Sequence, residues 1–501
     1  MGAPTTTRFD LWRWRGGFVL APLASAAAWA TVTTVTEPAH RLAAILAAVV
    51  VLWISEAIPM AMTAFLGVAL AVALGVAPAA EAFAPFADPL IFVFVGTFML
   101  ARAIIFHGLD RRFAFAILGL RVVGAHPGRL LAAYACVTGA VSMWISNTAT
   151  TAMMFPIGLS LLEALERHGT GVSPAYGAAL LLTTSFAASI GGLATPVGTP
   201  PNLIGIGFIR RELDLPLPFF TWMALGIPIV VALIVYLIWH LGRGSVPLGA
   251  RDEAAMRLIR AERAALGPWT RGQVNTVIAF GTTVFFWVLP GLVALVLGEQ
   301  HPTYRALVTA LPEGVVALLG AVLLFLLPTN VARHEFTLPW SEAVQIDWWI
   351  VFLYGGGIAL GTLAFQTGLA DAMGRGLTGA LGVHGGFELL CVATALGTLL
   401  SETTSNTASA NMIVPTVIAF ARSANIDPLL PAIGATMGAS LGFMLPVSTP
   451  CNAIVYGSGR IPLTLMMRRG LALDVVGVGV IVAVVWLLGP FVLSAHGPPR
   501  L

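Results

Sequence analysis

Apolar segments of similar length follow one another along almost the whole chain, separated by short polar stretches. A helix of about 20 apolar residues crosses the hydrocarbon core of a bilayer, and lipid cannot satisfy an open backbone. The pattern therefore predicts an all-α polytopic membrane protein with about 11 transmembrane helices. The expected spans lie near residues 17–35, 41–60, 62–79, 89–107, 176–206, 216–241, 273–297, 312–328, 345–370, 429–457 and 471–494.

Two further apolar regions, residues 128–167 and 386–422, are each interrupted in the middle by the sequence Ser-Asn-Thr. The interruptions lie in "SMWISNTATTAMMFP" (residues 142–156) and "SETTSNTASANMIVP" (residues 401–415). Irregular backbone at membrane depth is tolerated only where it is buried in protein or lines a cavity. We therefore expect two re-entrant helical hairpins, each entering and leaving on one side.

The two halves of the chain resemble each other. The Ser-Asn-Thr at 146–148 recurs at 405–407, and "PVGTPPNLI" (196–204) recurs as "PVSTPCNAI" (446–454). Broken helices in corresponding positions of inverted repeats point to a transporter site near the midplane. The alternative is that serine and threonine only hold helices together, but the paired motifs favour a binding site. The hydrophilic stretch 242–272 divides the chain into these halves, and we expect it to be a cytoplasmic linker.

The composition agrees with a membrane protein. Of 501 residues, 58% are hydrophobic and 10% are charged, against about 25% charged in soluble domains. The 26 basic residues are all arginine, and the net charge of +3 is scattered, so nothing indicates nucleic-acid binding. Arginines gather at the N-terminus, at 111–129, in the linker and at 468–469, which we place in the cytoplasm. We expect a multi-pass protein of the bacterial inner membrane, with a cytoplasmic N-terminus and a periplasmic C-terminus.

The polar motifs combine hydroxyl and amide oxygens with helix ends, which can present donors to an anion and carbonyls to a hard cation. None of the four motifs contains an arginine, lysine or histidine. An anion held there must be balanced by dipoles and co-bound cations, which favours cation coupling. The chain carries no HExxH motif, and we find no clustered set of nucleophile, base and metal ligands, so we do not expect an enzyme.

Four ionisable residues have two interpretations each. Glu56 and Glu402 can serve proton coupling or cation attraction, or they can cap helix ends or pair with arginine. Arg102 and His107 can contact substrate, or they can lie at the membrane interface.

The motifs "SMWISNTATTAMMFPIG", "ASIGGLATPVGTPPNLIG", "SNTASANMIVP" and "ASLGFMLPVSTPCNAIVYGSG" closely resemble the divalent anion/sodium symporter family, the INDY-type dicarboxylate, citrate and sulfate carriers. The resemblance covers nearly the whole chain after the first helix. It implies a homodimer in which a transport domain slides as an elevator against a scaffold. The scaffold helices would then lie in 1–127 and 273–385, and the transport-domain halves in 128–241 and 386–501. The implied sodium ligands are Ser142, Ser146, Asn147 and Gly198 in one site, and Ser401, Thr404, Asn406 and Ser448 in the other. The implied substrate residues are Asn147, Thr148, Thr199, Ser405, Asn406, Thr407, Thr449 and Pro450.

The chain departs from the family pattern at three positions. Ser448 stands where a smaller residue is common, Cys451 replaces a second proline, and Ser401 replaces an expected threonine. We expect sodium-driven import of C4-dicarboxylates such as succinate, malate or fumarate, with sodium as the coupling ion and no other cofactor. The alternatives are a sodium-independent dicarboxylate exchanger and a citrate or sulfate carrier of the same fold.

Overall fold

The computed structural model describes residues 8–123, 126–167, 173–246, 253–381, 383 and 385–493. The first half of the chain contains α1 (Arg8–Thr31), α2 (Glu37–Ser55), α3 (Met60–Ala73), α4 (Ala79–Phe83), η1 (Ala84–Ala87), α5 (Pro89–Phe106), α6 (Leu109–Leu118), α7 (Pro127–Ser142), α8 (Asn147–Arg167), α9 (Pro174–Gly191), α10 (Pro200–Leu213), α11 (Phe219–Gly242) and α12 (Glu253–Ala265).

The second half contains α13 (Arg271–Leu297), α14 (Pro302–Ala310), α15 (Glu313–Leu326), β1 (Pro328–Asn330), η2 (Val331–Arg333), β2 (Glu335–Phe336), α16 (Trp340–Ala343), α17 (Trp348–Gln366), α18 (Leu369–Leu381), α19 (Gly386–Thr403), α20 (Asn406–Ser423), α21 (Leu429–Gly438), α22 (Pro450–Tyr456) and α23 (Leu463–Leu493). The two short strands pair in antiparallel fashion. The chain is therefore helical almost throughout, as predicted.

Within the described residues, 7 helices are long and apolar enough to cross a membrane, and the bent pair α14–α15 would make an eighth. The predicted count of about eleven spans is higher because it includes α1, the shorter helices such as α3, and two regions that the structure divides. The regions predicted at 176–206 and 429–457 are each two helices, α9 with α10 and α21 with α22. The prediction of an all-α polytopic membrane protein is confirmed.

Of the short helices that were not predicted, α6 and α18 occupy corresponding positions in the two halves. The span expected at 345–370 ends at Gln366, and α18 begins separately after Gly368, whose φ is +80°. The equivalent break after α5 falls at Gly108, with φ +64°, and α6 follows. Glycine readily adopts this left-handed conformation, which ends a helix. A short helix therefore precedes each hairpin.

The polar stretch at 242–272, which was predicted to be a linker, contains a helix. It includes α12, which packs against α6 and α8. The C-terminal "SAHGPPRL", on which a periplasmic end was predicted, lies outside the described residues.

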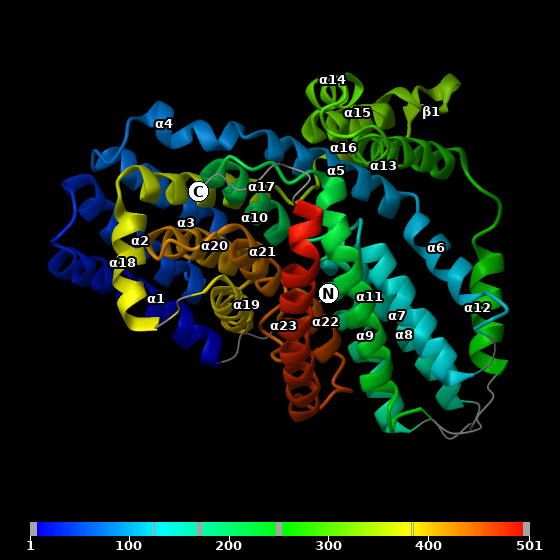
Figure 1. Cartoon of the computed structure of the whole chain (residues 1–501). Helices are drawn as coiled ribbons and strands as arrows, with labels where there is room; N and C mark the ends of the chain where they lie inside the picture. The colour runs from blue at the N-terminus through cyan, green and yellow to red at the C-terminus, as the bar shows by residue number, and fades with distance from the viewer. Residues whose placement is uncertain are drawn as a thin grey trace.

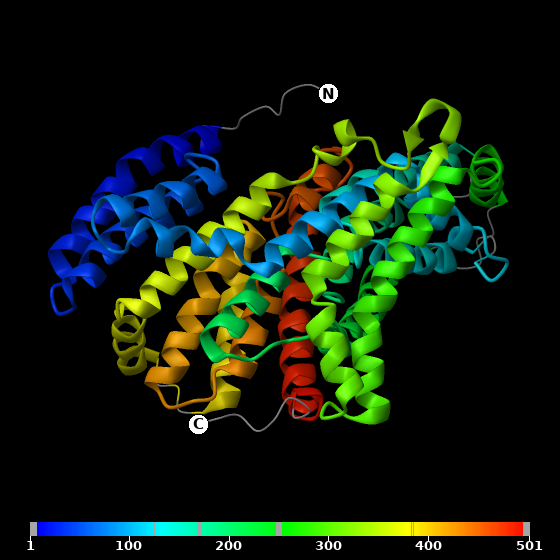
Figure 2. The same ribbon diagram turned by 90° about the horizontal axis from the view of Figure 1, so that it is seen from above.

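The helices are arranged around two apolar cores. Both ribbon views place α1, α2, α3 and α18 at one end of the molecule, and α6, α7, α8 and α12 at the other (Figures 1 and 2). One large core joins residues of α7 to α11 with residues of α20 to α23. A second core lies between α2, α3, α17 and α18, and it also contains Ala408 and Ala419 of α20. The second hairpin thus bridges the two cores.

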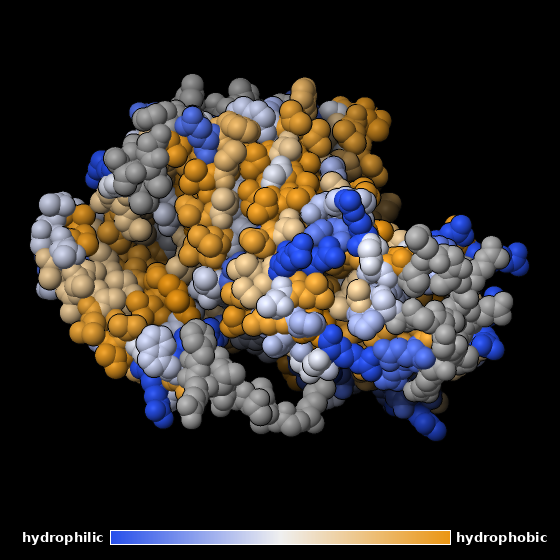
Figure 3. Space-filling view, turned by 90° about the horizontal axis from the view of Figure 1, so that it is seen from below, coloured by the Kyte–Doolittle hydropathy of each residue, from blue (hydrophilic) through white to orange (hydrophobic). Residues whose placement is uncertain are grey.

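Large apolar side chains cover much of the outside. Leu295 and Val296 at the end of α13 are 72% and 80% exposed, and Phe491 of α23 is 78% exposed. Figure 3 shows broad hydrophobic areas on one face, beside patches of hydrophilic residues. Continuous apolar surface of this extent marks contact with lipid or with another protein.

The first hairpin approaches α9 so closely that a side chain cannot fit between them. A Cβ at Gly191 would lie 2.2 Å from the carbonyl oxygen of Gly139 in α7. We expect Gly191→Val to destabilise the fold by about 1–3 kcal/mol, because the two helices must separate. The check is thermal unfolding of purified protein in detergent. Gly479→Val in α23, where no atom lies within 4 Å, is the matched control. Equal unfolding temperatures for the two variants would contradict this packing.

Candidate functional site

The tip of the first hairpin brings a buried hydroxyl to an asparagine amide. α7 ends at Ser142 and α8 begins at Asn147. The Ser142 hydroxyl donates to the Asn147 Oδ1 at 2.9 Å. Ser142 is fully buried, whereas Ser146 and Asn147 are partly exposed and Thr148 is exposed. The tip therefore presents polar atoms outward from a rigid, buried base.

The break between α9 and α10 is held by Asn202. Its amide nitrogen donates to the carbonyl oxygens of Gly192 at 2.9 Å and Thr195 at 2.8 Å. The Thr195 hydroxyl then donates to the Met143 carbonyl oxygen at 2.5 Å, which joins the break to the hairpin. A Cβ at Gly192 would lie 2.4 Å from Asn147 Oδ1, so the glycine lets the tip rest on the break.

The second hairpin repeats this arrangement. The Ser401 hydroxyl donates to Asn406 Oδ1 at 2.7 Å and to the Ala439 carbonyl oxygen at 2.9 Å. The Asn406 amide nitrogen donates to the Ser440 carbonyl oxygen at 3.3 Å. Thr404 exchanges a hydrogen bond with Ser409 at 2.7 Å. The Ser405 hydroxyl accepts from the Ala408 N–H at 3.2 Å and donates to the sulfur of Met60.

The break between α21 and α22 is held as the first one is. The Asn452 amide nitrogen donates to the carbonyl oxygens of Gly442 and Leu445, both at 2.9 Å. These three residues lie 250 positions after Asn202, Gly192 and Thr195. Thr449 caps α22 by accepting from the Asn452 N–H at 3.1 Å, whereas Thr199 makes no such bond at the start of α10. The repeat in the sequence therefore corresponds to a repeated set of hydrogen bonds in the structure.

The two halves meet behind the first hairpin. Cys451, which follows Thr449 and Pro450, is buried, and its thiol lies beside Thr148, Thr151 and Ser189. The Ser185 hydroxyl of α9 donates to Asn452 Oδ1. The second break is therefore packed against the first hairpin tip, and Cys451 occupies the contact.

An acidic pair in the second half is absent from the first. The Glu402 carboxylate accepts from the backbone N–H groups of Met444 at 2.7 Å and Leu445 at 3.1 Å, and from the Ser448 hydroxyl at 2.6 Å. Asp474 of α23 lies next to Glu402 and accepts from the Phe443 N–H at 3.4 Å. The positions matching Glu402 and Ser448 in the first half are Met143 and Gly198. Glu402 therefore fixes the second break and pairs with no arginine among the described residues.

Sequence reasoning did not find Asp474. It lies outside every repeated motif, in a helix whose other charged residues are Arg468 and Arg469, and only the packing of α23 on α19 and α21 brings it to the site.

The other ionisable candidates have structural partners. Glu56 pairs with Arg13 at 2.6 Å, and Arg102 pairs with Glu342 at 2.5 Å. His107 bonds the Thr337 carbonyl oxygen at 2.7 Å. Within the part of the chain that the structure describes, no arginine or histidine hydrogen-bonds to a hairpin tip or a break. The geometry can thus hold an anion only with neutral donors, helix ends and bound cations.

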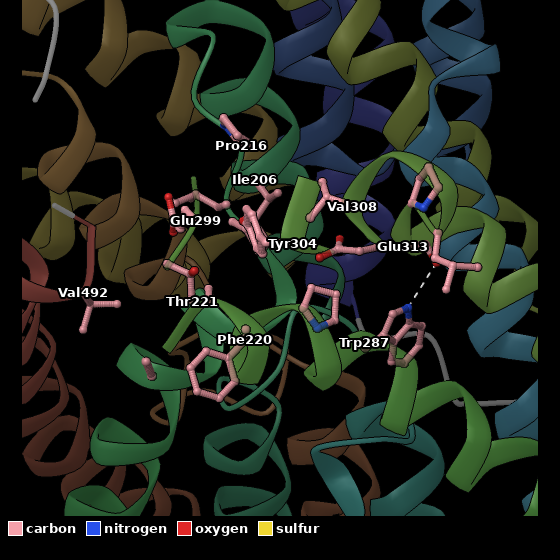
Figure 4. Close-up of a pocket in the computed structure, with 18 of the residues that line it drawn as sticks. Ile206, Pro216, Phe220, Thr221, Trp287, Glu299, Tyr304, Val308, Glu313 and Val492 are labelled. Carbon is pink, nitrogen blue, oxygen red and sulfur yellow. Dashed lines mark hydrogen bonds between the residues drawn. The ribbon is translucent and has the colours of Figure 1, made fainter. Parts of the chain in front are cut away.

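A separate cavity of about 440 Å³ lies between α10, α11, α13, α14 and α15 (Figure 4). Its lining is mostly apolar and includes Phe220, Trp287 and Tyr304, with Glu313 at one wall. The Trp287 indole donates to the Glu313 carbonyl oxygen at 3.1 Å. None of the Ser-Asn-Thr residues lines this cavity, so it is distinct from the candidate site.

Comparisons with known proteins agree with this geometry. Residues 19–494 match the family described as the sodium:sulfate symporter transmembrane region. The chain is 34% identical over 456 residues to the sodium-dependent dicarboxylate transporter SdcS of Staphylococcus saprophyticus, covering 88% of this chain and 84% of that one. It is 30% identical over 453 residues to SdcS of Staphylococcus aureus strain USA300, with the same coverage.

A solved structure shares the fold. The crystal structure of the Alcanivorax borkumensis YdaH transporter superposes with a TM-score of 0.56 and 16% identity, covering 98% of this chain and 100% of that one. At this identity the similarity concerns the fold alone.

The amides of Asn202 and Asn452 are the groups on which both breaks depend. Removing either asparagine takes a donor from two carbonyls, of which Thr195 and Leu445 keep a bond from a backbone N–H and Gly192 and Gly442 lose the bond that the asparagine supplies. We therefore expect Asn202→Ala and Asn452→Ala each to lower the free energy of unfolding by about 1–3 kcal/mol. Thermal unfolding in detergent measures this loss. Asn330→Ala, at the end of β1, where the side chain accepts a single solvent-exposed bond from the Arg333 N–H, is the control and should unfold like the parent chain. If the Asn202 and Asn452 variants matched that control, the breaks would be held by other contacts.

Proposed function

Because this chain belongs to the sodium:sulfate symporter transmembrane-region family, we propose that it is a secondary active transporter that imports C4-dicarboxylates together with sodium ions. Succinate, malate and fumarate are the substrates that we propose. The observation that carries the proposal is the duplicated tip and break, which places two similar polar half-sites in an apolar protein. The relatives named as sodium-dependent dicarboxylate transporters support the same reading.

Two sodium sites are proposed, one in each half. The first uses Ser142, Ser146, Asn147 and the Gly198 carbonyl, and the second uses Ser401, Thr404, Asn406 and the Ser448 carbonyl. In each, the serine hydroxyl and the asparagine Oδ1 already lie within hydrogen-bond distance. Hydroxyl, amide and carbonyl oxygens suit a hard cation and are poor ligands for zinc or copper.

The substrate carboxylates are proposed to meet the outer atoms of the tips and breaks. On one side these are Asn147, Thr148 and Thr199, and on the other Ser405, Asn406, Thr407, Thr449 and Pro450. The helices α8, α10 and α20 begin at these residues. The free N–H groups and positive dipole ends of these helices favour an anion, and most of all a fully ionised dicarboxylate.

Sodium supplies the charge that the pocket lacks. A dianion at membrane depth is costly unless it is neutralised, and no arginine or histidine among the described residues bonds to the tips. Two sodium ions next to the tips would balance two carboxylates. They would also hold the tips in place, so that sodium and substrate strengthen each other's binding.

The larger assembly follows from the same proposal. The hairpins with α9–α11 and α21–α23 form the transport domain, which slides against a scaffold of α1–α6 and α13–α18. We further propose that the protein is a homodimer in the bacterial inner membrane, with its N-terminus in the cytoplasm and its C-terminus in the periplasm.

The asparagines at the two tips each serve an ion and the substrate in this scheme. We therefore expect Asn147→Ala and Asn406→Ala each to reduce succinate uptake into proteoliposomes by roughly tenfold to a hundredfold, the factor for losing about 1–3 kcal/mol. Asn425→Gly, in the αL turn that follows α20, is the control. Near-normal uptake by either tip variant at matched protein levels would remove these residues from the site.

Sodium coupling is tested by affinity as well as by uptake. We expect succinate to bind at least tenfold more tightly in sodium than in choline, because the cations neutralise the carboxylates. Ser142→Ala and Ser401→Ala should each lose part of that gain. The measurement is isothermal calorimetry on purified protein, together with labelled uptake. Citrate and sulfate serve as competitors.

Equal affinity in the two salts, with uptake that needs only internal dicarboxylate, would identify an exchanger. Stronger competition by citrate or sulfate than by malate would identify the corresponding carrier.

A further inference from the structure

The two halves of the chain carry a matching pair of aspartates and a matching pair of arginines. Asp88 begins α5 and Asp347 begins α17, 259 positions later, the offset that relates the two Ser-Asn-Thr tips. Arg210 lies near the end of α10, and Arg460 follows α22 by the offset of 250 that relates the two breaks. Each arginine therefore stands eight residues after the asparagine that holds its break.

In the first half these residues form an ion pair. Arg210 donates to both oxygens of Asp88, each at 2.6 Å. The hydroxyl of Tyr354 in α17 donates to Asp88 at 3.2 Å. The Asp88 side chain is only 10% exposed. One nitrogen, Nη2, makes both contacts, and a charge-assisted hydrogen bond of this kind is about twice as strong as one between neutral groups.

In the second half the matching residues, Arg460 and Asp347, do not form an ion pair with each other. Arg460 pairs with Glu166 at the end of α8, at 2.9 Å. Asp347 is exposed and pairs with no arginine among the described residues. The matching residues therefore have different partners in the two repeats.

The backbone shows the same difference. A Cβ at Gly207 in α10 would lie 2.5 Å from the Tyr354 hydroxyl, so the end of α10 is pressed against α17. The matching Gly457 would meet only carbonyls of its own turn, those of Ala453 and Ile454. In the first repeat the end of α10 therefore packs against α17, whereas in the second repeat Gly457 at the end of α22 has no such contact with another helix.

Alternating access in proteins built from inverted repeats moves one set of elements against the other around a central site. If the two repeats exchange conformations, Arg460 takes the place relative to Asp347 that Arg210 now has relative to Asp88. We propose that Arg210–Asp88 and Arg460–Asp347 are alternate ion pairs that position the transport domain at the two ends of its movement. Arg460 leaves Glu166 when the second pair forms, and Arg210 leaves Asp88.

The exchange has a simple energetic consequence. Breaking the Arg210–Asp88 pair alone would leave a largely buried carboxylate without its partner, which is costly. Forming a similar pair in the other half compensates for that loss. Similar ion pairs then stabilise both end states, so neither state is much lower in free energy than the other. This inference rests on the proposed function, because it requires a transport domain that moves.

The first experiment is cross-linking in membranes. In a chain with Cys136→Ala, Cys391→Ala and Cys451→Ser, a short bismaleimide is applied to three cysteine pairs. Arg210→Cys with Asp88→Cys and Arg460→Cys with Glu166→Cys report the state described above. Arg460→Cys with Asp347→Cys reports the opposite state.

We expect all three pairs to cross-link, and the Arg210–Asp88 and Arg460–Asp347 cross-links each to lower succinate uptake at least tenfold. Adding Arg210→Ala should raise the yield of the Arg460–Asp347 cross-link severalfold, because it releases the competing state. Arg211→Ala, which removes the neighbouring exposed arginine, should leave that yield unchanged. A merely local role for Arg210 would not affect a cross-link in the other repeat.

The second experiment needs no cysteine changes. Asp347→Asn and Arg460→Gln should each slow uptake about tenfold, and the double variant should be no slower than the slower single variant. Residues that never meet would instead give multiplied losses. The proposal is overturned if the Arg460–Asp347 pair fails to cross-link in a chain that transports, or if the two losses multiply.

Cross-linking does not depend on the identity of the substrate. A chain that shows both sets of cross-links but no sodium-driven succinate uptake would therefore refute the proposed function and leave the alternating pairs standing.

Discussion

Every break in a membrane helix must satisfy its own backbone, because lipid offers no hydrogen bonds. This chain breaks its helices at four corresponding places and meets the requirement with buried asparagines and serines. Asn202 and Asn452 each pair with two carbonyls of a break, while Ser142 and Ser401 each bond the asparagine at a hairpin tip. The polar groups that are left at the rim are partly exposed, and these are the groups available for ions and substrate. The requirement to pair the backbone groups at each break therefore produces the cluster of polar side chains that forms the candidate site.

The two half-sites share this framework but differ in charge. In the first half, a neutral hydroxyl on Thr195 joins the break to the hairpin by donating to the Met143 carbonyl. In the second half, the Glu402 carboxylate makes the corresponding connection through Met444, Leu445 and Ser448. The first half shows that a break can be held without a carboxylate. Glu402 therefore places a carboxyl group beside one proposed sodium site and not the other, in addition to its structural contacts.

The asymmetry extends to the ion pairs at the ends of α10 and α22. A protein assembled from two copies of one unit could place both in the same conformation, yet Arg210 is docked on Asp88 while Arg460 is bound to Glu166. A central site can open to one side only when the halves differ in this way. In the transport cycle proposed above, the repeats provide the common framework, and the choice of ion-pair partner would distinguish the two conformations.

The sequence by itself determined the membrane class, the hairpins, the breaks and the repeat, because each depends on local properties. An apolar run of spanning length, a Ser-Asn-Thr in its middle and a proline after threonine have direct consequences for the backbone nearby. The predicted hairpin at 128–167 begins at Pro127 in the structure, and the one at 386–422 ends at Ser423. The family resemblance supplied candidate ligands for the same motifs.

Only the tertiary structure decided which distant residues meet. Asp474 lies beside Glu402, Cys451 lies against Thr148, and Arg210 reaches Asp88, and no spacing along the chain predicts these contacts. It also assigned Glu56 and Arg102 to ion pairs with Arg13 and Glu342. The physical reason is that helix formation and helix breaking are set by neighbouring residues. Which distant residues become partners depends instead on how the rigid helices pack against one another. Rotating one helix about its axis changes every side chain that faces its neighbour.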